Sequence, residues 1–109
     1  MSLVIKKAFA EKLANEFLME IDKAKFIFVD GSEIEQITIG KQVVLDENAK
    51  IFWAVLSLEY NASSVNTIKE IHYSDVSGNT IMKEIDITIN VNIGKNLIMH
   101  KIAFAYQEE

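Results

Sequence analysis

The first part of the chain repeats its apolar residues at the spacing of an amphipathic helix. Between residues 3 and 22, apolar side chains recur at every fourth position, and smaller ones widen the stripe: Ile5, Phe9, Leu13, Phe17 and Ile21, with Ala10, Ala14 and Leu18. Lysine and glutamate residues occupy the remaining positions. This pattern predicts one helix over residues 3–22, with Ser2 as its N-cap and the apolar stripe facing the core.

After Lys25 the pattern changes to short apolar runs separated by turn residues. Asp30-Gly31 and Gly40-Lys41 predict tight turns, and Asp75 with Gly78 predicts a type I turn followed by a bulge. Across that turn we expect Tyr73 to pair with Ile81. The predicted strands cover residues 26–29, 34–39, 43–45, 50–60, 67–74, 80–93 and 96–106. Residues 1–109 are therefore predicted to form one α+β domain, a helix packed on a mostly antiparallel sheet of about six or seven strands in hairpins over residues 25–106.

The last two predicted strands fit each other as a hairpin. If Gly94-Lys95 is a type II′ turn, Ile89 faces His100 and Ile85 faces Phe104, and the facing positions on one side of the hairpin are almost all apolar. A slip of one residue would turn the polar positions inward. The pattern therefore predicts that residues 85–93 pair with residues 96–104.

One predicted strand, residues 51–58, is apolar on both of its faces. Phe52, Ala54, Leu56 and Leu58 point one way, and Ile51, Trp53 and Val55 point the other. A single helix covers only one face of a sheet, so the other face needs the N-terminal strands as a second layer or a partner subunit. We favour a partner and expect a homo-oligomer. The contact candidates are Trp53, Phe52, Leu56, Ile51 and Val55, since large side chains at an interface centre carry most of its energy.

Composition removes several classes of function. The 109 residues hold 16 acidic residues against 11 lysines, with a net charge of −5, no cysteine and no proline. Arginine is absent from the sequence. Disulfides, thiolate metal sites and cysteine nucleophiles are excluded, and an acidic chain without arginine is not expected to bind nucleic acid or an anionic membrane. No apolar run approaches about 18 residues, and the N-terminus lacks the order of a signal peptide, so the cytoplasm is the expected location.

The residues capable of chemistry are few. Of the two histidines, His100 falls on an apolar face, and His72 lies beside Tyr73 but on the opposite face of a strand. No calcium loop, zinc motif, phosphate-binding loop or nucleophile elbow is present, so no catalytic, cofactor-binding or metal-binding residues are predicted. The leading interpretation is a non-enzymatic assembly module that binds itself or other assembly proteins. The alternative is a small-ligand-binding or enzyme domain of cystatin-like shape, with a pocket near His100, Tyr73 and Tyr106.

Part of the sequence resembles a known family. After the leading helix come Ile68-Lys69-Glu70-Ile71, then Asp75, and then Gly78-Asn79-Thr80-Ile81. This arrangement resembles the N-terminal domain of bacteriophage tail-collar and tail-fibre proteins, over about half of the chain. The chain is shorter than that family's pattern and lacks its glycine-rich stretch between helix and sheet. The resemblance implies a prophage-derived structural component, found in the virion, with no catalytic residues to carry over.

Overall fold

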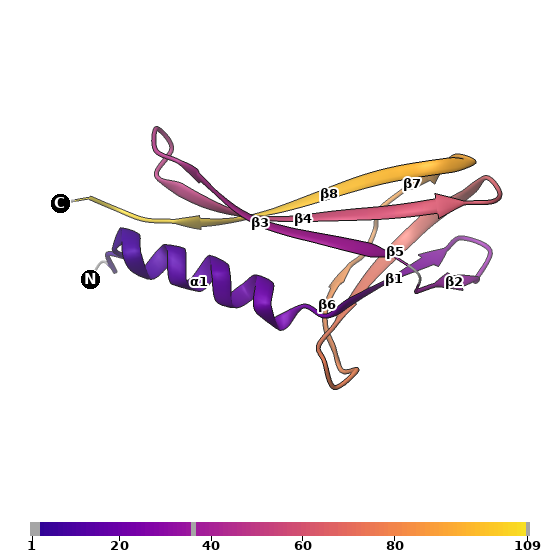
Figure 1. Ribbon diagram of the computed structural model, residues 1–109, viewed down its shortest axis with the longest axis horizontal. Coiled ribbons are helices and arrows are strands. Elements are labelled where there is room, and N and C mark those ends of the chain that lie inside the picture. The colour runs from indigo at the N-terminus through magenta and orange to yellow at the C-terminus, as the bar shows by residue number, and fades with distance from the viewer. Residues whose placement is uncertain (1–2, 36, 109) are drawn as a thin grey trace.

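The computed structural model describes residues 3–35 and 37–108, and in these residues one helix precedes eight strands (Figure 1). The α+β class is therefore confirmed, with a slightly higher strand count than predicted. Every strand pair is antiparallel. The elements are α1 (Lys7–Glu20), β1 (Lys23–Phe28), β2 (Glu33–Ile34), β3 (Thr38–Asp46), β4 (Ile51–Ala62), β5 (Asn66–Ser74), β6 (Thr80–Glu84), β7 (Ile89–Val91) and β8 (Gly94–Ala105).

The strands form two sheets instead of the one predicted. Sheet A has the order β2-β1-β5-β6, with β7 also paired to β5, and sheet B has the order β3-β4-β8. In Figure 1, α1 runs below β3, β4 and β8, and β1 and β6 lie on the same lower side. The helix and sheet A therefore form one layer, which packs against one face of sheet B.

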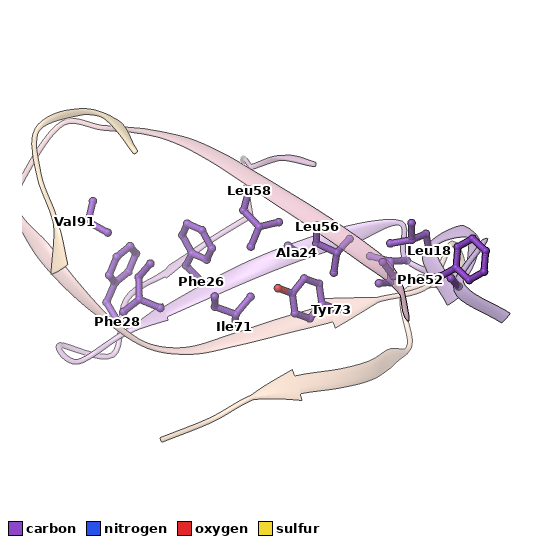
Figure 2. Close-up of a cluster of buried hydrophobic side chains, with 14 of the residues drawn as sticks. Leu18, Ala24, Phe26, Phe28, Phe52, Leu56, Leu58, Ile71, Tyr73 and Val91 are labelled. Carbon is purple, nitrogen blue, oxygen red and sulfur yellow. The ribbon is translucent and has the colours of Figure 1, made fainter. Parts of the chain in front are cut away.

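The core lies between these two layers. Alternate residues of β4, from Phe52 to Leu58, point into it and are at most 2% exposed. Helix α1 and sheet A supply the opposing side chains, and together they form one continuous cluster. Figure 2 shows these side chains in a row, from Val91 and Phe28 at one end to Leu18 and Phe52 at the other. Burial of this row stabilises the fold by about 25 cal/mol per Å² of apolar surface.

The helix is shorter than predicted, and only part of the predicted apolar stripe faces the core. Its N-cap is Lys6, which makes no side-chain capping bond, and Ser2 lies outside the described residues. Ala10, Ala14 and Leu18 are the buried helix residues, whereas Phe9 is 51% exposed. A helix has about 3.6 residues per turn, so residues four apart form a slanting ridge. The ridge of small alanine side chains faces sheet B, and the ridge of larger side chains that contains Phe9 lies beside it.

The predicted C-terminal hairpin is wrong. Strand β8 pairs with β4 along its whole length, so that His100 faces Leu56 and Phe104 faces Phe52. The predicted strand 80–93 is divided into β6 and β7, and Asp86 between them has a positive φ of 57°. Gly94 begins β8 instead of forming a two-residue turn. The alternating pattern of β8 suits any long apolar strand, and β4 is the longer and more apolar partner.

The other predicted turns have mixed outcomes. Strands β1 and β2 do pair across Asp30-Gly31, but the connection is longer than two residues. Gly40-Lys41 is not a turn, because both residues lie inside β3. The turn at Asp75 is confirmed, since the Gly78 amide donates to the Asp75 carbonyl at 3.0 Å and Gly78 has a φ of +85°. Its register differs by one residue, because an irregularity after Tyr73 pairs that residue with Met82 instead of Ile81.

Candidate interaction surface

Sheet B has a second face, which points away from α1 and sheet A. We call it the outer face, and because side chains alternate along a strand, it carries the residues between the core positions. Helix α1 and sheet A both pack against the opposite face of sheet B. The apolar residues of the outer face are Val44 on β3, Ile51, Trp53 and Val55 on β4, and Leu97, Met99, Ala103 and Ala105 on β8.

These apolar side chains are open to solvent to different degrees. Val44 is 40% exposed, Met99 55% and Leu97 60%. Ile51 and Trp53 are half-buried, whereas Val55, which lies between Gln42 and Lys101 in the register, is 5% exposed. The outer face is therefore a candidate interaction surface, since groups of exposed apolar side chains often serve as contact sites.

The outer face is hollowed near the turn between β3 and β4. An open hollow of about 670 Å³ is lined by Trp53, Val44 and Leu45, by the turn residues Asp46, Glu47 and Asn48, and by Lys101. Oδ1 of Asp46 accepts the Ala49 amide at 3.1 Å, which holds the turn in shape. The hollow therefore has the only tryptophan of the sequence on its wall, an acidic turn at one side and a lysine at the other.

The structure separates the five contact candidates into two groups. Ile51, Trp53 and Val55 lie on the outer face, and of these Ile51 and Trp53 offer surface to a partner, whereas Val55 is buried between its neighbours. Phe52 is 2% exposed and Leu56 is 0% exposed, and both point into the core between the layers. This corrects their assignment to an interface, because no partner reaches them in the folded chain.

Sequence reasoning missed the contributions of the neighbouring strands. Val44, Leu97 and Met99 flank β4 on the outer face because β3 and β8 are its partners. The predicted hairpin had instead placed β8 next to residues 85–93. The signal that would have found these residues is the length of β4, which offers two long edges for pairing.

His100 belongs to a contact between the two sheets. Its Nδ1 lies 2.6 Å from Oε2 of Glu84 on β6, and its ring centroid is 6.5 Å from that of Tyr73 on β5. The Tyr73 hydroxyl is buried and has no hydrogen-bond partner. Burial, and secondly the charge of Glu84, raise the pKa of Tyr73 well above its usual value. The contact between Glu84 and His100 therefore joins the two sheets at one margin of the core.

Tyr106, the third residue of the alternative pocket, lies elsewhere. It follows the end of β8, and its ring packs against Phe52 with centroids 5.5 Å apart. His100 faces Leu56, four residues further along β4. Tyr106 also lines an open hollow with Leu3, Ile5 and Gln107, in which neither His100 nor Tyr73 takes part. The structure therefore does not bring the three residues of the alternative together.

His72 lies on the opposite face of β5 from Tyr73, as predicted. Its Nε2 is 2.7 Å from Oε1 of Glu70, and this hydrogen bond is the main cause that lowers the pKa of Glu70. The nearby Lys25 is paired with Glu33 at 3.4 Å. Local charges here are thus largely matched, and within residues 3–35 and 37–108 no group of three or more potential metal ligands occurs.

Comparison with known proteins gives no match: no family model, no curated protein and no solved structure is significantly similar to this chain. None of the described residues forms a helix with the length and apolarity needed to cross a membrane.

Proposed function

We propose that this protein is a non-enzymatic assembly module that self-associates through the outer face of sheet B. The observation that carries the proposal is the apolar surface around Trp53, which the helix and sheet A leave uncovered. Association would remove this surface from water, with a stabilisation of about 25 cal/mol per Å² before the entropy of association is subtracted. Tryptophan at the centre of such a surface is a typical energetic anchor.

The edges of sheet B support the same proposal. Strands β3 and β8 form the two edges of the sheet, and they are 9 and 12 residues long. Natural monomers protect long edges with lysine, proline, bulges or short strands; this sequence has no proline, and the lysines on the two edges are Lys41, Lys95 and Lys101. Edges of this length favour contact with other protein chains, whether a second copy or another assembly protein.

The resemblance to phage tail-collar proteins gives the proposal a more specific form. The segment that carries it forms the middle of β5, the turn at Asp75 and the start of β6. We propose on this basis that the assembly is a prophage-derived tail component. A gene neighbourhood rich in tail and baseplate genes would support this form, and a neighbourhood of unrelated metabolic genes would contradict it.

The direct test is Trp53→Glu, which places a charge at the centre of the outer face. Light scattering with size-exclusion chromatography should show an oligomer for the wild type and a monomer for the variant, from about 1 µM to about 1 mM. Val44→Glu, at a position already 40% exposed, provides a second variant with less risk of unfolding. Val76→Glu is the matched control, because Val76 is 85% exposed in the β5–β6 turn.

The control should keep the wild-type mass. As an independent measurement, the emission of the single tryptophan should shift to shorter wavelength with increasing concentration, because association moves its ring out of water. A wild type that stays monomeric at every concentration, or a folded Trp53→Glu variant that still forms the oligomer, would contradict the proposal.

A further inference from the structure

The charged residues of the outer face are arranged about Trp53. On β3, Asp46 pairs with Ile51, two residues before Trp53. On β8, Lys101 pairs with Val55, two residues after Trp53. Asp46 and Lys101 therefore lie at opposite ends of a diagonal that passes through Trp53, and both line the hollow beside it.

These charges are available to a partner. Glu47 extends the acidic end of the diagonal, and it is exposed, as is Lys101. Among the described residues, neither Glu47 nor Lys101 makes an ion pair with another side chain. The remaining charged pair on the outer face is already matched, because Lys95 Nζ lies 2.9 Å from Glu59 Oε1 near the other end of the sheet.

This arrangement is complementary to itself. Consider two copies whose outer faces meet, related by a two-fold axis that lies between them. If this axis passes over Trp53 at right angles to the diagonal, it exchanges the two ends of the diagonal. It sets Trp53 against the same residue of the second copy, and it sets each Lys101 against the acidic turn of the other. A two-fold axis along the diagonal itself would instead oppose lysine to lysine and acid to acid, which is unfavourable.

We propose that two copies of this chain pair face to face about this axis, with Trp53 at the centre and Lys101 opposite Asp46 and Glu47 of the second copy. The proposal rests on the self-association described above and adds its geometry. The pairing buries the apolar residues around Trp53 and places the charges at its rim, as in other specific interfaces.

Charge reversal tests the geometry. Lys101→Glu alone and Glu47→Lys alone should each weaken self-association by about tenfold, because each places like charges at both rims of the pair. An equimolar mixture of the two variants should recover association. In a mixed pair, one rim keeps the original Glu47 opposite the original Lys101, and at the other rim both charges are reversed, so that they again attract. Glu47 is chosen over Asp46 because Asp46 holds its own turn. Lys69→Glu, an exposed residue of sheet A, is the control and should behave as wild type.

The outcomes separate this geometry from self-association in general. Weakening by both variants, with recovery in the mixture and a dissociation constant that rises with salt, supports the two-fold pairing. Wild-type association in both single variants, or no recovery in the mixture, overturns the pairing while self-association stands. A wild type that remains monomeric to about 1 mM overturns both proposals.

Discussion

Nδ1 of His100 and Oε2 of Glu84 lie 2.6 Å apart, and this contact joins β8 of sheet B to β6 of sheet A. Both strands are at the end of their sheets, so the contact closes one margin of the core. The two side chains are 29% and 28% exposed, which places the interaction between a surface pair and a buried one. It is the only hydrogen bond between side chains of the two sheets among the described residues.

We expect the Glu84–His100 pair to contribute about 1 kcal/mol to stability, less than a fully buried charged hydrogen bond and more than a surface pair. The check is a double-mutant cycle with Glu84→Ala and His100→Ala, measured by urea unfolding. The control cycle uses Lys12 and Glu16, which are 3.8 Å apart and more than half exposed. That pair should give less than about 0.5 kcal/mol. An equal or smaller coupling for Glu84 and His100 would contradict the expectation.

Tyr73→Phe should stabilise the protein by about 1 kcal/mol. The Tyr73 side chain is fully buried and its hydroxyl has no partner, so the wild type carries the desolvation cost of an unpaired polar group. Urea unfolding of the variant measures the gain. Tyr73→Ala, which also removes the ring, should instead lose about 3–5 kcal/mol by opening a cavity. A loss of stability in Tyr73→Phe would show that the hydroxyl has a partner in solution.

Stability should fall at alkaline pH in a way that depends on Tyr73. Burial, and then Glu84, raise the pKa of this residue above its ordinary value of 10.0, so the folded state holds the proton more tightly than the unfolded state. The stability that comes from keeping Tyr73 protonated in the folded state is fully present below about pH 10, and it is lost as the pH rises above that value. Unfolding free energies at about pH 9 and about pH 11 should differ more in the wild type than in Tyr73→Phe. Equal declines in the two proteins would exclude this cause.

Gly94→Ala should destabilise the protein by about 1–3 kcal/mol, whereas Gly40→Ala should be tolerated. Gly94 has a φ of +101° at the start of β8, a conformation that is strained for alanine even though space is open around it. Gly40 lies inside β3, and an added Cβ would sit 3.5 Å from Cβ of Ser57, an ordinary contact. Thermal or urea unfolding of the two variants measures the difference. Equal losses would show that β3 does not accommodate the added Cβ at Gly40.

The sequence was informative where a local pattern determines structure. The helix, the turn at Asp75 and the two apolar faces of β4 follow from spacing and turn chemistry within a few residues. The choice of neighbouring strand does not follow from local spacing, because the alternation in β8 is equally compatible with a hairpin and with pairing to β4. The predicted apolar stripe of α1 is buried at Ala10, Ala14, Leu18 and Ile21 but not at Ile5 and Phe9, because the small alanine side chains are what allow sheet B to approach.

The candidate surface was predictable in part for the same reason. Ile51, Trp53 and Val55 could be recognised from β4 alone. Val44, Leu97 and Met99 join them only through the pairing of β3 and β8, which involves contacts distant in sequence. The relation between Lys101 and Asp46 likewise exists only once three strands are placed side by side.

The alternation of β4 means that one strand serves two separate requirements. Variants at even-numbered positions from Phe52 to Leu58 should lower the amount of folded protein in a cell, since those side chains form the core. Variants at Ile51 and Trp53 should leave protein levels nearer to normal and affect recognition of other chains. A mutational scan read out separately for abundance and for binding would therefore show the two phenotypes alternating residue by residue along a single strand.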